Sequence, residues 1–262
     1  MEAPRHAQPL IGKVALITGA ARGIGLAIAA RLAADGADIV ALDLPGAPLV
    51  DCVETVQASG RRAVPVEGDV GVAADWERAV GLAVDELGRL DVLVNNAGIA
   101  GVTSPIVDYP EDVFDRVMLV NIRGVFLGIK YAAKVMQTNG GAIINISSVS
   151  GLSGSRAILP YTASKHAVIG MTKVAALELA SHGIRVNAVC PAPTATEMMF
   201  NLERTQSPDN PTAVRERFAA SIPLGRYGEP SEIAAAVAFL ASSESSFMTG
   251  AAVVVDGGLL AS

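Results

Sequence analysis

The chain has 262 residues, which is long enough for one or two domains. Hydrophobic residues make up 51% of it and charged residues only 18%, so the chain can bury a large core, and intrinsic disorder is excluded. Its net charge of −6 leaves no basic stripe to follow a phosphate backbone, so we expect no nucleic-acid partner.

Seven short apolar runs alternate with helical patterns along the chain. The runs are rich in β-branched residues and bounded by Gly, Asp or Asn, which is typical of strands covered on both faces. They are Val14–Thr18, Asp38–Leu42, Arg62–Val66, Asp91–Val94, Ala142–Ser147, Ile184–Val189 and Ala252–Val255. Strands that alternate with helices predict an α/β protein: a single-domain Rossmann fold whose doubly wound, seven-stranded parallel sheet has helices on both faces.

One stretch breaks this alternation. Between Pro191 and Pro230 the chain contains further prolines and a Met-Met-Phe cluster, with only a short helical pattern near Val214–Ala220. A long irregular insertion after the carboxyl end of a strand is usually a functional loop on the ligand-binding side. We therefore expect residues 192–226 to form a substrate-binding lid on one catalytic domain, 1–262, of which 1–9 are an N-terminal tail.

No apolar stretch approaches the roughly 18 residues of a membrane span. The first ten residues also lack the hydrophobic segment of a secretory signal. Cys52 and Cys190 lie far apart, outside any metal-ligand spacing, and the three histidines are scattered. We expect a cytoplasmic protein with no membrane attachment and no metal site.

The first strand runs into a glycine-rich turn, Thr18–Gly25, that a helical pattern follows. Glycines at such a turn let the backbone approach a pyrophosphate closely, and the helix N-terminus offers unpaired N–H groups to its charge. The pattern favours a dinucleotide site over a mere tight turn. Asp43, at the end of the second strand, accepts hydrogen bonds from a ribose diol and repels a 2′-phosphate, which favours NAD over NADP. Arg22 partly offsets that repulsion.

Tyr161 and Lys165 are four residues apart in a helical pattern, so their side chains share one face. At an effective dielectric constant near 20, an ammonium about 4 Å away favours the phenolate by roughly 4 kcal/mol and lowers the pKa of the phenol by about 3. A phenol tuned in this way suits general acid–base catalysis near neutral pH. The alternative is an ordinary helix pair.

These residues match the pattern of a known family. From Leu10 to about Gly258 the chain resembles a classical short-chain dehydrogenase/reductase. The resemblance rests on separately spaced motifs: Thr18–Gly25, Asn95–Gly98, Asn121, Ser148, the Tyr161/Lys165 pair and Val255–Gly258.

The resemblance implies four catalytic residues. Tyr161 is the general acid in ketone reduction and the general base in alcohol oxidation, and Ser148 hydrogen-bonds the substrate oxygen. Lys165 binds the nicotinamide ribose and lowers the pKa of Tyr161, assisted by the positive charge of the oxidised nicotinamide. Asn121 holds a water that links Lys165 to solvent. The alternative interpretation of Asn121 is a structural asparagine that kinks a helix.

The resemblance also implies how the cofactor is held. Asp69 and Val70 contact the adenine, Ile24 packs near the pyrophosphate through its backbone, and Thr196 binds the nicotinamide carboxamide. The full expected cofactor set is Gly19, Arg22, Gly23, Ile24, Gly25, Asp43, Asp69, Val70, Asn96, Ala97, Gly98, Tyr161, Lys165, Pro191, Thr194 and Thr196.

One departure from the family pattern is Ala192, which follows Pro191 where the family usually has glycine. Its β-carbon restricts positive φ and predicts a different lid geometry. The neighbouring Cys190 has no histidine partner, so we interpret it as a buried strand-end residue and not as a nucleophile.

We expect an NAD-dependent oxidoreductase that interconverts a secondary alcohol and a ketone. The segments nearest the chemistry are largely apolar, so the predicted substrate is neutral, fairly apolar, and cyclic or aromatic. The alternative is a 3-oxoacyl-carrier-protein reductase that uses NADPH; Asp43 and the acidic composition argue against it. A dinucleotide-sensing regulator without chemistry should lack part of Ser148, Tyr161 and Lys165, and this chain keeps all three.

Residues 161–180 carry small and apolar side chains on several helical faces, more than one buried side needs. Together with the family resemblance, this predicts a homotetramer.

Overall fold

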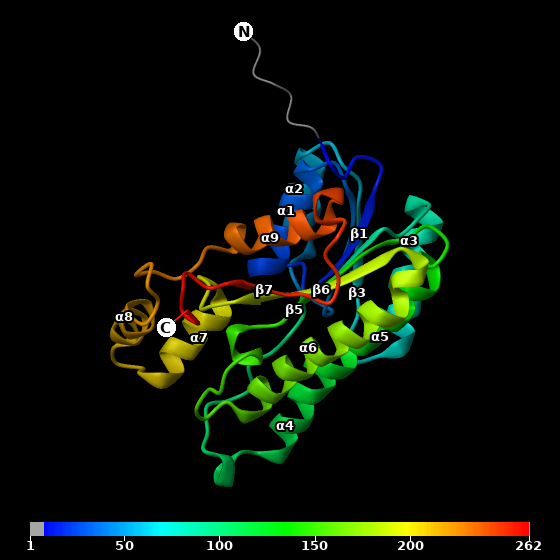
Figure 1. The fold of residues 1–262 in the computed structure, drawn as a ribbon. Coiled ribbons are helices and arrows are strands. Elements are labelled where there is room, and N and C mark those ends of the chain that lie inside the picture. Colours follow the sequence, from blue (N-terminus) through cyan, green and yellow to red (C-terminus); the bar gives the residue numbers. More distant parts are fainter. Residues whose placement is uncertain (1–7, 262) are drawn as a thin grey trace.

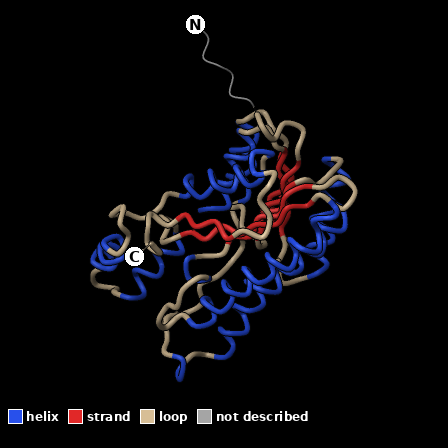
Figure 2. Tube along the Cα trace, in the orientation of Figure 1, coloured by secondary structure: helices blue, strands red, loops and turns tan. Residues whose placement is uncertain are grey.

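The computed structural model describes residues 8–261; residues 1–7 of the predicted tail lie outside the described residues. The centre is a parallel seven-stranded sheet in the order β3-β2-β1-β4-β5-β6-β7 (Figure 2). The strands are β1 (Val14–Thr18), β2 (Asp38–Asp43), β3 (Ala63–Glu67), β4 (Val92–Asn95), β5 (Gly141–Ile146), β6 (Ile184–Pro191) and β7 (Ala252–Val255). The seven predicted strands and their parallel pairing are confirmed, with shifts of one or two residues at some ends.

Helices cover both faces of the sheet, as expected for a doubly wound fold (Figure 1). One layer contains α1 (Gly23–Ala34), α2 (Leu49–Ala58) and α9 (Pro230–Ala241). The other contains α3 (Ala73–Leu87), α4 (Glu111–Met118), α5 (Gly124–Met136) and α6 (Leu159–Leu179).

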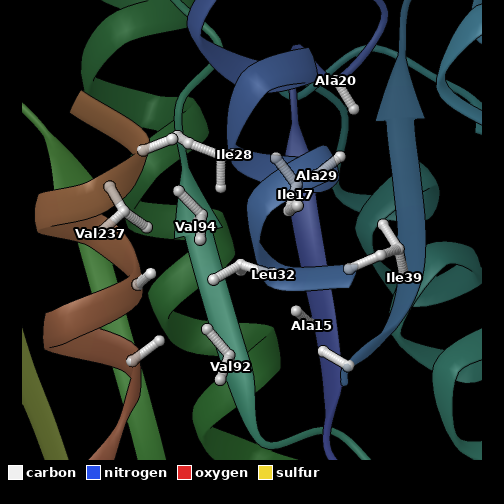
Figure 3. Close-up of a cluster of buried hydrophobic side chains, with 14 of the residues drawn as sticks. Ala15, Ile17, Ala20, Ile28, Ala29, Leu32, Ile39, Val92, Val94 and Val237 are labelled. Carbon is white, nitrogen blue, oxygen red and sulfur yellow. The ribbon is translucent and has the colours of Figure 1, made fainter. Parts of the chain in front are cut away.

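Alternation along each strand divides the core into two layers. In β1, Ala15 and Ile17 join the cluster beneath α1 and α9, whereas Val14 and Leu16 join the cluster on the opposite face. Figure 3 shows the first cluster, in which Ile28 and other side chains of α1 lie over β1 and β4. Burying each Leu or Ile side chain contributes roughly 1.5–3 kcal/mol to folding stability. A one-residue shift of β1 would move these side chains to the opposite faces, so packing on both faces fixes the register of β1.

The expectation of an irregular lid with one short helical pattern is wrong. Residues 192–226 contain two helices, α7 (Glu197–Gln206) and α8 (Pro211–Ala220), which lie together beside the C-terminal residues at the left of Figure 1. The prolines occupy positions that helices tolerate. Pro211 stands in the first turn of α8, where its missing N–H is not needed, and the Asn210 side chain caps that helix by accepting from the Ala213 N–H at 3.1 Å.

Among residues 8–261 no helix is long and apolar enough to cross a membrane.

Candidate active site

The predicted site residues gather where the strand order reverses. The chain runs outward from β1 to β3, returns to β4 beside β1, and then continues to β7. In open α/β sheets this reversal leaves a crevice at the carboxyl ends of the strands. The structure brings to that edge the turn after β1, Asp43 at the end of β2, Asn96–Gly98 after β4, Ser148 after β5 and Pro191 at the end of β6.

The turn after β1 is shaped to receive an anion. Gly19 and Gly23 have positive φ values of 64° and 56°, a backbone conformation that side chains disfavour. A β-carbon at Gly25 would lie 1.9 Å from the Gly19 carbonyl oxygen, so only glycine fits there. α1 begins at Gly23 with no side-chain cap at Arg22 and no acidic residue in its first turn, which leaves its N–H groups for a pyrophosphate.

Asn96 secures this turn to the neighbouring strand. Its side-chain amide donates to the Thr18 and Gly19 carbonyls at 2.8 and 3.1 Å. In return, the Thr18 hydroxyl accepts from the backbone N–H groups of Asn96 and Ala97 at 3.0 and 2.9 Å. Sequence reasoning placed Thr18 in the glycine motif but assigned it no role of its own. The structure makes it the hydrogen-bonding centre between β1 and β4.

Asp43 presents a fixed carboxylate beside the same turn. Its oxygens accept from the Ala21 N–H at 2.9 Å and the Leu44 N–H at 2.8 Å. Each oxygen keeps acceptor capacity for a ribose hydroxyl. Arg22 is exposed and makes no ion pair within residues 8–261, so Asp43 is not neutralised by it.

Asp69 and Val70 form a braced turn after β3. The Asp69 carboxylate accepts from the Gly71 N–H at 2.8 Å and lies 3.5 Å from the Arg116 guanidinium. The Trp76 indole donates to the Val70 carbonyl at 2.8 Å. Arg116 was not singled out in the sequence, because nothing in its spacing links it to a residue 47 positions earlier.

Ser148 and Tyr161 meet through a side-chain hydrogen bond, which acts to lower the pKa of the phenol. The Ser148 oxygen also accepts from the Ser150 N–H at 3.1 Å, so the single Ser148 hydroxyl hydrogen is the one directed to the Tyr161 oxygen. Ser148 reaches this position because it ends the strand-to-helix turn after β5, and Tyr161 because it lies in the first turn of α6.

The expected effect of Lys165 on Tyr161 is not met in this structure. Burial raises the pKa of Tyr161 above its ordinary value and outweighs the Ser148 hydrogen bond. The Lys165 ammonium lies 5.5 Å from the Tyr161 ring centroid and donates to the Ile146 carbonyl at 2.8 Å. Lys165 is 5% exposed, and burial lowers its own pKa to about 8.

Asn121 lies in a π-helical turn, Leu119–Arg123, between α4 and α5. Its amide group donates to the Ile99 carbonyl at 2.9 Å and to the Ser164 hydroxyl at 3.0 Å, and its oxygen accepts from the Ile99 N–H at 2.9 Å. A β-carbon at Gly98 would lie 3.3 Å from the Asn121 oxygen and 3.5 Å from Lys165 Nζ. Asn121 therefore ties the loop after β4 to α6 beside Lys165, and Ser164 is a partner that sequence reasoning missed.

The segment after β6 connects the site to the lid. Ala192 keeps a negative φ, since Ala157 is the one non-glycine residue of positive φ in the described part of the chain. Alanine is therefore unstrained there, and the predicted lid change is not needed on that account. Thr194 is buried and donates to the Ala192 carbonyl at 2.9 Å, so its hydroxyl faces its own backbone. The Thr196 methyl group lies 3.4 Å from the position that a β-carbon would take at Gly23.

Cys190 is fully buried, and burial raises the pKa of its thiol, which agrees with a structural role. Across residues 8–261 no group of three or more His, Cys, Asp or Glu side chains is placed to hold a metal ion.

Comparisons with known proteins agree with this geometry. A family model described as enoyl-(acyl carrier protein) reductase matches residues 19–260. The chain is also 43% identical over 254 residues to a short-chain dehydrogenase/reductase of Armillaria gallica, a match that covers 95% of this chain and 96% of that protein. The chain belongs to the short-chain dehydrogenase/reductase family.

Two further members are similar over almost their whole length. The (S)-acetoin-forming diacetyl reductase of Staphylococcus epidermidis is 41% identical over 256 residues, covering 95% of this chain and 99% of the relative. The crystal structure of an NAD⁺-bound xylitol dehydrogenase superposes with a TM-score of 0.91 at 38% identity, covering 95% of this chain and 99% of that one.

Proposed function

We propose that the chain is an NAD-dependent dehydrogenase that interconverts a secondary alcohol and a ketone. One observation carries the proposal: Tyr161 lies at the same sheet edge as the glycine turn. There it is hydrogen-bonded to Ser148, and the Lys165 ammonium lies 5.5 Å from its ring centroid. The similarity to a diacetyl reductase and to an NAD⁺-bound xylitol dehydrogenase supports the same chemistry and cofactor.

The residues present fit NAD. The uncapped N-terminus of α1 and the glycine turn would hold the pyrophosphate, and Asp43 the adenosine ribose. Asp69 and Val70 would border the adenine, and Lys165 and Thr196 the nicotinamide half. When bound, NAD⁺ accepts the hydride from the alcohol carbon.

The side chains of the site handle the proton. Ser148 donates a hydrogen bond to the substrate oxygen and stabilises the charge that develops there. In oxidation the Tyr161 phenolate accepts the proton of the alcohol hydroxyl, and in reduction the phenol returns a proton to the carbonyl oxygen. Burial raises the pKa of Tyr161, and we propose that the positive charge of a bound NAD⁺ would lower it to the working range.

The proposed substrate is neutral and fairly apolar. The lid residue Glu197 pairs with Arg204, so its charge is compensated. The exposed Met198 and half-buried Met199 offer adaptable apolar surface at the start of α7. We propose that residues 192–226 are the lid of a single catalytic domain and close the pocket with these side chains.

The test is an oxidation assay that follows the formation of NADH or NADPH. The panel contains neutral alcohols (cyclohexanol, butanediol and phenylethanol), a hydroxycyclohexanecarboxylate and a hydroxyacyl carrier protein, each with NAD⁺ and NADP⁺. The proposal predicts turnover of the neutral alcohols with NAD⁺. Turnover confined to the carboxylate would refute the neutral substrate, and turnover confined to the carrier protein with NADP⁺ would establish the carrier-protein reductase instead.

We further propose that the enzyme is a cytoplasmic homotetramer. Val174 and Leu177 of α6 are 55% and 83% exposed, and Phe247 is also fully exposed, which is more apolar surface than an isolated chain needs. The buried, unpaired thiols of Cys52 and Cys190 suit a reducing compartment. Sedimentation as a monomer at micromolar concentration would contradict the tetramer.

A further inference from the structure

The lid is a helical hairpin whose two ends are fastened together. Thr194 and Gly228 form a parallel β-bridge, in which the Ala195 N–H donates to the Gly228 carbonyl at 2.8 Å and the Gly228 N–H to the Pro193 carbonyl at 3.0 Å. Between these ends, α7 and α8 pack against each other. The two ends of the lid are therefore held together beside the site. The position of α7 between them depends on further contacts.

One guanidinium on α8 contacts two residues of α7, Phe200 and Glu203, which are one helical turn apart. Arg215 donates to both oxygens of Glu203, with its Nε at 3.2 and 3.1 Å and its Nη2 at 2.8 Å. The same group lies 4.6 Å from the centroid of the Phe200 ring. Glu203 is 1% exposed, whereas the Arg215 side chain is 49% exposed and closes over the carboxylate. A carboxylate so deeply buried needs this partner, since an unpaired buried charge is costly.

The start of α7 lies close to the glycine turn. Thr196 immediately precedes α7, and its methyl group lies 3.4 Å from the position that a β-carbon would take at Gly23. The Phe200 N–H donates to the Thr196 carbonyl at 3.0 Å. Phe200 is thus one helical turn from the residue that meets the glycine turn, and Glu203 is one turn further. Any rotation of α7 that releases Glu203 also moves Thr196 and the two methionines between them.

We infer that Arg215 is a positioning residue for the alcohol substrate: by holding Glu203 and Phe200, it keeps α7 in its binding position before any ligand arrives. The inference rests on the proposed dehydrogenase function for its kinetic part. Tyr227, which follows the lid, is buried near the same carboxylate, and burial and Glu203 together raise the pKa of its hydroxyl. Among residues 8–261 the Tyr227 hydroxyl has no hydrogen-bond partner, so Arg215 is the group that holds this carboxylate.

Three variants of the full chain test the inference. Arg215→Met removes the ion pair with Glu203 and the contact with the Phe200 ring. Arg215→Lys keeps the charge but loses the bidentate geometry. Arg217→Met is the matched control. Arg217 lies on the same helix and also reaches α7, donating to the Gln206 side chain at 2.7 Å, but it makes no ion pair among residues 8–261.

Two readouts are measured: steady-state kinetics with the best neutral alcohol, and amide hydrogen exchange of residues 197–206 without ligand. For Arg215→Met we expect KM for the alcohol to rise about tenfold or more, kcat to change less than about threefold, and exchange in α7 to quicken about tenfold. Arg215→Lys should fall between wild type and Arg215→Met. Arg217→Met should stay within about twofold of wild type in both readouts.

Unchanged exchange in α7, an unchanged KM, or equal effects of Arg217→Met would each overturn the inference. If Arg215→Met does not fold, Arg215→Lys carries the same comparison. If wild type oxidises no alcohol, the proposed function fails, but exchange in α7 still decides whether Arg215 holds the lid.

Discussion

Asp43→Asn is the substitution that most sharply examines the cofactor site. Asparagine keeps a carbonyl oxygen for the Ala21 N–H, which Asp43 accepts at 2.9 Å, so the glycine turn retains its support. The substitution removes the negative charge and, because an amide nitrogen cannot accept, also the hydrogen bond from the exposed Leu44 N–H at 2.8 Å. The contact to the glycine turn is kept, so a change in cofactor preference reports mainly on the charge.

The magnitude follows from charge and exposure. Two charges about 4 Å apart interact by roughly 4 kcal/mol at an effective dielectric constant of 20. Asp43 is half-buried, so solvent and salt reduce its repulsion of a 2′-phosphate to about 1–2 kcal/mol. Charge-assisted hydrogen bonds to the ribose are stronger than neutral ones by about 1 kcal/mol. We therefore expect the Kd of NADH to rise about fivefold and that of NADPH to fall about tenfold.

The assay is fluorescence titration of both reduced cofactors on purified protein at low and high salt. Asp51→Asn, which removes an exposed charge on α2, is the control and should change neither constant. The shift in the NADPH constant should shrink as salt increases. A preference ratio that stays within about twofold of wild type in a folded Asp43→Asn variant would refute the electrostatic reasoning.

Three other predictions follow from the described contacts. Burial lowers the pKa of Lys165 from 10.5 to about 8, so between these pH values the unfolded chain binds more protons than the folded chain. As pH rises from 8 to 10.5, wild type should therefore gain about 3 kcal/mol of stability relative to Lys165→Met. Parallel pH profiles in urea unfolding would contradict this. Ala157 has a φ of +61°, so Ala157→Val should destabilise the fold by about 1–2 kcal/mol while Ala157→Gly stays near wild type in thermal melts. Equal melting temperatures would be the contrary result. Asn96→Asp places carboxylate oxygens against the Thr18 and Gly19 carbonyls, so it should lower the free energy of unfolding by about 1–3 kcal/mol and abolish NADH binding. Urea unfolding and fluorescence titration measure the two effects. A variant that binds NADH normally would show that this amide does not support the turn.

The sheet and the cofactor edge could be predicted because their signals are local and repeated. Each strand is a short apolar run with polar or glycine boundaries, and strands that alternate with helices allow few topologies. Asp43 and Asn96 could be placed at one edge because the carboxyl ends of parallel strands coincide. Their hydrogen bonds to the glycine turn could not be predicted, since these depend on the register between β1, β2 and β4.

The lid shows where sequence patterns mislead. α7 has no glycine or proline inside it, but the prolines around it indicated irregular chain. The one fully buried residue of α7 is a glutamate, so the helix has no apolar periodicity that marks its buried face. Glu203 is buried only because Arg215, twelve residues later, covers it. A charged residue in a core position is not predictable until its partner is known.

The pKa of Tyr161 could not be predicted for a related reason. Helical spacing places Lys165 beside it, but the ammonium is directed to the Ile146 carbonyl on another element, 19 residues earlier in the chain. Burial then decides the direction of the shift. Asn121 is a similar case, because its partners Ile99 and Ser164 come from two other segments.

The most direct test of the account compares Tyr161→Phe with wild type in two measurements on the same preparations: oxidation of the best neutral alcohol with NAD⁺, and the Kd of NADH. Tyr131→Phe on α5, outside the site, is the matched control. The account predicts that Tyr161→Phe loses at least about two orders of magnitude in kcat while binding NADH within about threefold of wild type. A Tyr161→Phe variant that still oxidises the alcohol at the wild-type rate would contradict the assignment of Tyr161 as the proton acceptor.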